Sequence, residues 1–150
     1  MDDTSPILIL YLDTSSLVKL YLDEVHSETV HRWAQEAEVL ATSRVAYPET
    51  FAALTRRWRE GDFDDASVQR VIAAFKEQWP AFAILDLNET AAGELAITHA
   101  LRGFDAIHLV AALDLRLAAE DILVAFTAFD GRLAQAARAE GLQVLDAAAG

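Results

Sequence analysis

Short apolar runs alternate along the chain with longer segments whose apolar residues recur at helical spacing. The first run, residues 7–12 (ILILYL), contains no charged residue and no polar alternation, which is typical of a strand buried on both faces of a sheet. It ends directly on Asp13, which is followed by Thr14, Ser15 and Ser16. Shorter apolar runs predict four further strands, at residues 39–43, 82–87, 122–126 and 142–145.

The segments between these runs predict helices. Apolar residues spaced three and four apart indicate helices within residues 15–22, 27–38, 44–60, 68–79, 89–101, 105–120 and 130–141. Asn88 is expected to cap the fifth of these helices, and Gly103 to break the chain after it. The sixth helix has an apolar face too wide for a surface element, so we expect it to be largely buried.

The order of these elements predicts the fold class. Strands that alternate with helices are typical of an α/β domain, here a three-layer α/β/α sandwich with a mainly parallel sheet of about five strands. Residues 1–150 show no internal repeat and no linker-like segment, so we expect a single domain. In such folds the ligand site lies at the carboxyl ends of the strands, and candidate chemistry is therefore sought there.

Composition narrows the setting. The chain has 150 residues, 53% of them hydrophobic, which is enough for one domain with a substantial core. It has no cysteine, so disulfides and thiolate metal sites are excluded, a cytoplasmic location is expected, and any metal must be held by oxygen or histidine. No apolar run approaches the roughly 20 residues needed to span a bilayer, and the start of the chain lacks the basic flank of a secretory signal.

The charge balance restricts the partners. Twenty-four acidic residues against twelve basic ones give a formal net charge of −12. Sequence-independent binding to nucleic acid needs a basic face that neutralises phosphates, and this composition gives no indication of one. Local arginines together with a bound cation can still reverse the field inside one cleft. The same charge also suits a basic protein partner.

Four acids from distant segments are candidates for a common site. Asp13 follows the first strand, Asp130 follows the fourth, Asp105 opens the buried helix, and Glu49 lies near the start of the helix after the second strand. Each has a structural explanation as well, because aspartate is a preferred helix N-cap and glutamate in a first turn complements the helix dipole. Convergence favours function, since carboxylates in apolar surroundings are costly unless they are paired or bound to a metal. Clustered carboxylates without thiols suit Mg²⁺ or Mn²⁺.

Other polar residues near these acids have open roles. Arg102 and Arg132 flank Asp105 and Asp130, and each is either a phosphate contact or a solvated charge. His108 lies one helical turn after Asp105, where it either braces a carboxylate or is simply a buried histidine with satisfied hydrogen bonds. The sequence contains neither a glycine-rich phosphate loop nor a G-x-S-x-G motif, so nucleotide-binding and serine-hydrolase chemistry lack support.

Four segments of the chain resemble the PIN-domain family, most closely its VapC-type toxins from bacterial toxin–antitoxin pairs. They are YLDTSSLVKLYLDE, YPETFAAL, LRGFDAIHLVAAL and FDGRLAQAARAEGLQVL, in the order in which the family has them. The resemblance implies a PIN-like fold and an acidic metal pocket formed by Asp13, Glu49, Asp105 and Asp130. It also implies that Ser15 is a supporting hydroxyl, which orients Asp13 or a bound water.

The same resemblance implies an activity and partners. It points to a Mg²⁺-dependent endoribonuclease, with Mn²⁺ as a substitute, that hydrolyses RNA with an activated water. It further implies a homodimer and a small antitoxin whose basic C-terminal segment reaches the acid pocket. Two positions depart from the family pattern: Ala128 stands where a hydroxyl residue often precedes the fourth acid, and Pro48 directly precedes Glu49 inside a helix.

Rival classes remain open from the residues alone. An aspartyl phosphatase needs a second aspartate two residues after the first, where this chain has Ser15. A receiver-like signalling domain could use Asp86 after the third strand, but it also needs a lysine after the fifth, and no lysine follows Lys76. A PIN nuclease that is not a toxin, and a PIN-like binding module without catalysis, complete the alternatives.

Overall fold

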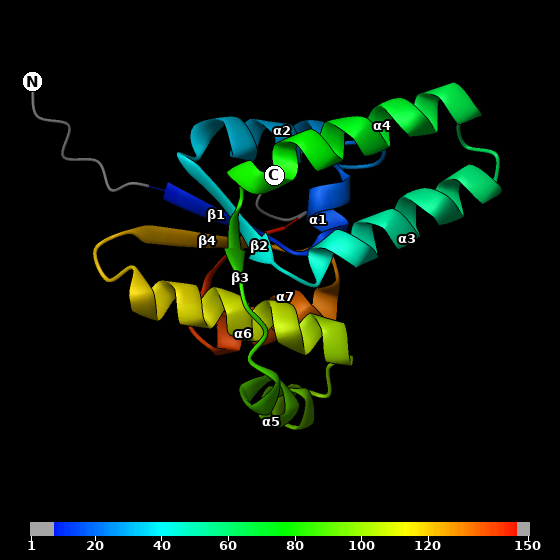
Figure 1. The fold of residues 1–150 in the computed structure, drawn as a ribbon. Helices are drawn as coiled ribbons and strands as arrows, with labels where there is room; N and C mark the ends of the chain where they lie inside the picture. The colour runs from blue at the N-terminus through cyan, green and yellow to red at the C-terminus, as the bar shows by residue number, and fades with distance from the viewer. Residues whose placement is uncertain (1–7, 147–150) are drawn as a thin grey trace, which may run out of the picture.

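A five-stranded parallel sheet forms the middle layer of the molecule (Figure 1). The computed structural model describes residues 8–146. The strand order is β3-β2-β1-β4-β5 and every neighbouring pair is parallel. The strands are β1 (Leu8–Leu12), β2 (Val39–Ser43), β3 (Ala83–Leu85), β4 (Leu123–Thr127) and β5 (Gln143–Leu145). All five predicted strands are confirmed, although β3 is shorter than expected and Ile7 lies outside the described residues.

Helices cover both faces of this sheet, as Figure 1 shows, so the predicted α/β/α sandwich is confirmed. One layer comprises α1 (Thr14–Val18), α2 (Ser27–Glu36), α3 (Ala46–Arg59) and α4 (Asp65–Gln78), the last extended by a short 3₁₀ turn, η1 (Trp79–Ala81). The other comprises α5 (Glu89–His99), α6 (Gly103–Ala118) and α7 (Gly131–Ala139). Within residues 8–146, no helix combines the length and the apolar character that crossing a bilayer requires.

The central strand β1 is buried on both faces, as its uniformly apolar sequence predicts. Ile9 and Tyr11 belong to the core beneath α5, α6 and α7, whereas Leu10 and Leu12 belong to the core beneath α1, α2 and α4. The alternation follows from the two-residue period of a strand. The strand ends at Leu12, and Asp13 follows it directly. The first candidate acid therefore lies at the edge of both cores.

Several helix boundaries differ from the prediction, and the connection between α5 and α6 shows a local reason. Gly103 does not break the chain but is the first residue of α6; the break lies at Ala100, which ends α5 in the left-handed conformation at φ 54°. At the start of α5, Asn88 is the expected cap, since its Oδ1 accepts a hydrogen bond from the Ala91 N–H at 3.4 Å. Helix α1 begins at Thr14, immediately after β1, and this abrupt start places Asp13 at its N-terminus.

Candidate functional site

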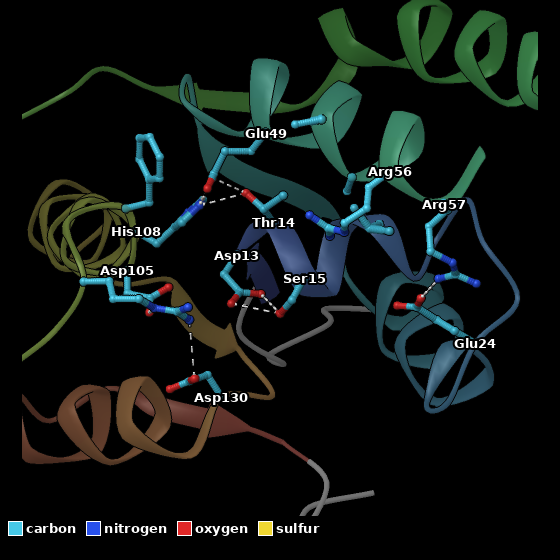
Figure 2. Close-up of a pocket in the computed structure, with 15 residues that line it drawn as sticks. Asp13, Thr14, Ser15, Glu24, Glu49, Arg56, Arg57, Asp105, His108 and Asp130 are labelled. Atoms are coloured by element: carbon cyan, nitrogen blue, oxygen red, sulfur yellow. Dashed lines mark hydrogen bonds and ion pairs between the residues drawn. The ribbon is translucent and has the colours of Figure 1, made fainter. Parts of the chain in front are cut away.

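The four candidate acids line one open pocket of about 460 Å³ at the carboxyl end of the sheet (Figure 2). Asp13 follows β1, Asp130 follows β4, Glu49 lies in the first turn of α3 and Asp105 in the first turn of α6. The convergence inferred from the strand order is therefore present in the structure. Because parallel strands bring their carboxyl ends to one edge, residues more than 100 positions apart share this pocket.

Asp13 is both a helix cap and a wall of the pocket. Its Oδ1 accepts a hydrogen bond from the Ser16 N–H at 2.9 Å, which caps α1. The Ser15 hydroxyl donates to the two carboxylate oxygens, at 2.9 Å and 3.1 Å. Asp13 is only 4% exposed, so these donors hold it in one orientation. The supporting role expected of Ser15 matches this geometry.

Glu49 is held by two partners from other elements. Thr14 donates a short hydrogen bond to Glu49 Oε1, and His108 Nε2 lies 3.0 Å from the same oxygen. Burial raises the pKa of Glu49, but the hydrogen bonds from His108 and Thr14 outweigh it and leave that pKa below its usual 4.5. Pro48 lies in the same first turn of α3, where helix N–H groups have no intrahelical partner, so its missing donor is tolerated.

His108 connects Glu49 to the centre of the sheet. It is 2% exposed, and its Nδ1 lies 2.8 Å from the hydroxyl of Tyr11, which is completely buried. Burial, with the charge of Asp13 nearby, raises the pKa of Tyr11 well above 10.0, so this hydroxyl stays protonated and donates a hydrogen bond to Nδ1. Nε2 then carries the ring proton and donates toward Glu49. Both descriptions left open for His108 therefore hold: it is a buried histidine with satisfied hydrogen bonds, and it braces the Glu49 carboxylate.

Tyr11 and Thr14 are site residues that the sequence reasoning missed. Tyr11 was counted among the apolar strand residues, and Thr14 was treated only as a residue following Asp13. Their partners are 97 and 35 positions away, so no local pattern reports the pairing. The one usable signal was the spacing of three between Asp105 and His108, which places both on one side of α6.

Asp105 is not the N-cap of α6, so its explanation as a helix cap fails. The N-cap of α6 is Arg102, and Asp105 lies inside the first turn. Burial raises the pKa of Asp105 above its usual 3.8; Arg102 opposes this effect, and the charges of Asp13 and Asp130 add to it. The carboxylates of Asp13, Asp105 and Asp130 are thus close enough to repel one another electrostatically, as in a crowded acid site.

Asp130 combines a cap with a more open position. Its Oδ1 accepts the Leu133 N–H at 3.0 Å and caps α7, and its side chain is 43% exposed. Thr127 does not support it: this buried hydroxyl lies 3.2 Å from Ser16 Oγ instead, and Ala128 is buried without a polar group. Among the described residues, no side-chain hydroxyl takes the supporting position that Ala128 leaves empty.

Arg102 and Arg132 both lie at the rim, as their place in the sequence predicts. Arg102 is 80% exposed and bridges two acids, with Nε 3.3 Å from Asp105 and Nη2 3.6 Å from Asp130. Arg132 donates to the Ala100 carbonyl at 3.1 Å. Arg102 is therefore an exposed counter-charge to both carboxylates, at a position where a bound cation would compete with it.

The donor set fits a hard divalent cation. Four carboxylates and the Ser15 hydroxyl present oxygen atoms only, which Mg²⁺ and Mn²⁺ prefer over softer ligands. Within residues 8–146, no three His, Asp or Glu side chains already form a closed ligand set. An ion that keeps several waters does not need one, because water molecules span the remaining distance to the carboxylates.

The position of Asp86 argues against the receiver-like alternative, which needs this acid in the pocket. Asp86 follows β3, a strand at the edge of the sheet, and its side chain is 83% exposed and paired with Arg44 at 2.7 Å. It does not line the acid pocket. Position 15 likewise offers Asp13 a hydroxyl instead of the second carboxylate that an aspartyl phosphatase needs.

Comparisons with known proteins agree on one family. The PIN-domain model matches residues 10–139. Ribonuclease VapC45 from Mycobacterium tuberculosis is 34% identical over 142 residues, which are 93% of this chain and 96% of that protein. Two solved structures share the fold: FitAcB from Neisseria gonorrhoeae (TM-score 0.66, 15% identity, 91% of this chain and 96% of that one) and VapC20 from M. tuberculosis, described as a toxin that cleaves the sarcin-ricin loop (TM-score 0.57, 18% identity, 89% and 95%).

Proposed function

The chain belongs to the PIN-domain family, and from this membership we propose that it is a Mg²⁺-dependent endoribonuclease, the toxin of a type II toxin–antitoxin pair. One observation carries the proposal. Asp13, Glu49, Asp105 and Asp130 come from four separate segments and line a single pocket, with no thiol or basic nucleophile among them. A relative with 34% identity over nearly the whole chain is itself named a ribonuclease, which agrees with this chemistry.

Each acid has a distinct part in the proposed hydrolysis. Asp13, Asp105 and Asp130 would hold Mg²⁺, which when bound lowers the pKa of water and stabilises charge on the reacting phosphate. Glu49 is ionised and fixed by Thr14 and His108, so it is suited to complete the shell around the ion or to orient the attacking water. Ser15 keeps Asp13 in its orientation. The products would carry a 5′-phosphate and a 3′-hydroxyl.

The charge of the molecule supports the proposed partners. A pocket in which five carboxylates outnumber three arginines, in a chain of net charge −12, attracts a basic segment, as an antitoxin tail would supply. Such a segment would neutralise the acids in the way that Arg102 already does for two of them. The proposal includes this antitoxin and a homodimeric toxin, each testable by co-purification and by light scattering.

The test compares the wild type with Asp13→Asn on RNA in Mg²⁺, in Mn²⁺ and in chelator. Asparagine is nearly isosteric and is itself a good N-cap, so the variant should fold while losing the charge. We expect cleavage by the wild type only with a divalent ion, and a loss of at least about 100-fold in the variant. Undiminished cleavage by Asp13→Asn would refute the assignment.

A binding module without catalysis is the second candidate. It is favoured by one contact, the bridge from Arg102 to Asp105 and Asp130, which satisfies two acids without any ion. Titration calorimetry with Mn²⁺ separates the two functions. A nuclease binds the ion at the acid pocket and loses this binding on Asp13→Asn, whereas a silent module shows no binding in either form.

A further inference from the structure

A second hollow lies next to the acid pocket, on helix α3. It has a volume of about 560 Å³ and is lined by Phe51, Ala52, Thr55, Arg56, Arg59 and Glu60. Ala52 and Arg56 line the acid pocket as well, so the two hollows adjoin. The surface accessible from the acids therefore extends along the outer side of α3.

The sequence of α3 places these residues on a single stripe. Glu49, Ala52, Arg56 and Arg59 are spaced by three, four and three residues, the spacing of one helix face. At a rise of 1.5 Å per residue, the stripe extends about 15 Å from the acid pocket to Arg59. It begins at a proposed catalytic acid and ends on two arginines.

The charges of these two arginines are unused. Both are exposed, and among the residues that the structure describes neither guanidinium makes a hydrogen bond or an ion pair. Their neighbour Arg57 differs, since it pairs with Glu24 at 2.5 Å and with Asp62. Figure 2 shows this contrast: Arg56 reaches from α3 toward α1 above the pocket, while Arg57 is tied to Glu24 at its far end. Glu60 is the one acid lining the second hollow.

Arginines also border the opposite side of the acids. A third hollow, of about 350 Å³, shares Arg102, Asp105 and Asp130 with the acid pocket and adds Ala100 and Arg132. The acids thus lie between two basic margins, Arg56 with Arg59 on α3 and Arg102 with Arg132 beside α7. A phosphate chain crossing the acids would meet a guanidinium on each side, and guanidinium groups match phosphate oxygens in geometry and charge.

We propose that the stripe on α3 is a binding path for single-stranded RNA, in which Arg56 and Arg59 contact the phosphates on one side of the bond to be cut. This inference rests on the proposed ribonuclease function and adds to it the direction in which the strand leaves the pocket. The net charge of −12 should repel RNA as a whole. Arg56 and Arg59 offset this repulsion locally, because their charges lie along the proposed path of the strand. Single-stranded RNA is the form whose backbone can bend into a pocket and along one helix.

The test measures binding of a labelled single-stranded RNA of about 12 nucleotides by fluorescence anisotropy in chelator, so that no cleavage occurs. The full chain is compared with Arg56→Ala/Arg59→Ala, and with Arg32→Ala as the matched control, since Arg32 is an exposed arginine on α2 that lines none of these hollows. Thermal unfolding checks that all three are folded.

We expect the double variant to bind at least about tenfold more weakly. The slope of log K against log salt should fall by about 1.4, the value for two phosphates of a single strand. Arg32→Ala should change neither. Equal binding by the double variant and the control would overturn the path. So would a blunt RNA duplex that binds the wild type as tightly as the single strand does. An acidic peptide that binds the same arginines more tightly than the RNA would overturn it as well.

The cleavage assay keeps the two proposals apart. If the wild type cuts RNA with Mg²⁺ but the arginine variants bind as it does, the path is wrong and the nuclease stands. If RNA binding depends on both arginines but no divalent ion yields cleavage, the nuclease is wrong, and α3 is the contact surface of an RNA-binding module.

Discussion

His108 Nε2 lies 3.0 Å from Glu49 Oε1, and the Thr14 hydroxyl contacts both atoms, so one buried imidazole and one hydroxyl fix the pose of a proposed catalytic carboxylate. Behind them, Tyr11 holds the other ring nitrogen at 2.8 Å. The acid is therefore positioned from the core of the sheet outward.

Replacing His108 should lower turnover more than it weakens RNA binding. His108→Ala removes the donor to Glu49 and should reduce kcat about 10- to 100-fold, the usual cost of losing a residue that orients an active-site group. His108→Gln can still donate from its amide and should recover part of that loss. Cleavage kinetics on one RNA would test this, and equal kcat in the two variants would contradict a positioning role.

Asp13 should reveal its two roles through two substitutions. Asp13→Ala removes both the N-cap of α1 and the charge, so it should cost about 1 kcal/mol of unfolding free energy as well as the activity. Asp13→Asn keeps the cap and should lose only the activity. Chemical denaturation of both variants measures the difference; if they are equally destabilised, the cap contributes nothing to stability.

Asp105 should destabilise the fold when it is charged. Its pKa is raised in the folded state, so ionisation costs stability once the pH rises above 3.8, the value for the unfolded chain. Asp105→Asn should therefore raise Tm at pH 7 by about 2 °C, and the gain should shrink as the pH falls through 3.8 and vanish only where the carboxyl is fully protonated in both states.

Magnesium provides the control for that prediction. Added Mg²⁺ should raise the Tm of the wild type, because a bound cation relieves the repulsion among Asp13, Asp105 and Asp130. It should have much less effect on Asp105→Asn. A variant that is less stable than the wild type at pH 7 in chelator would show that the Arg102 bridge outweighs the repulsion.

Removing Arg102 should separate metal binding from RNA binding. Arg102→Ala eliminates a guanidinium that occupies two of the proposed ligands, so Mn²⁺ should bind about two- to fivefold more tightly in calorimetry. The KM for RNA should rise, because a phosphate contact is lost. Weaker Mn²⁺ binding in the variant would mean that Arg102 positions the acids instead of competing with the ion.

The strands of the sheet could be predicted from the sequence because each is a short apolar run that is visible in the local pattern. The run at 39–43 corresponds to β2 residue for residue, and parallel connectivity then brings Asp13 and Asp130 to one edge. Helix boundaries were less predictable. The sequence predicts the break between α5 and α6 at Gly103, whereas Ala100 adopts the left-handed conformation that ends α5.

The contacts that refine the site could not be predicted, because they depend on which side chains meet across the sheet. Tyr11 matches the apolar pattern of β1, and nothing in that pattern reports a hydroxyl aimed at His108. Arg56 and Arg59 are similarly two exposed arginines among twelve basic residues until the folded surface joins their hollow to the acids.

The pairing of β1 with β4 has a consequence for the chain during synthesis. Leu8 is in register with Leu123 and Leu12 with Thr127, so the first strand can pair with this neighbour only after the chain has been made as far as residue 127. Asp130 arrives later still. A nascent chain that ends before this point has three of the four acids but no complete pocket, so the proposed site cannot form until β4 and Asp130 have been synthesised.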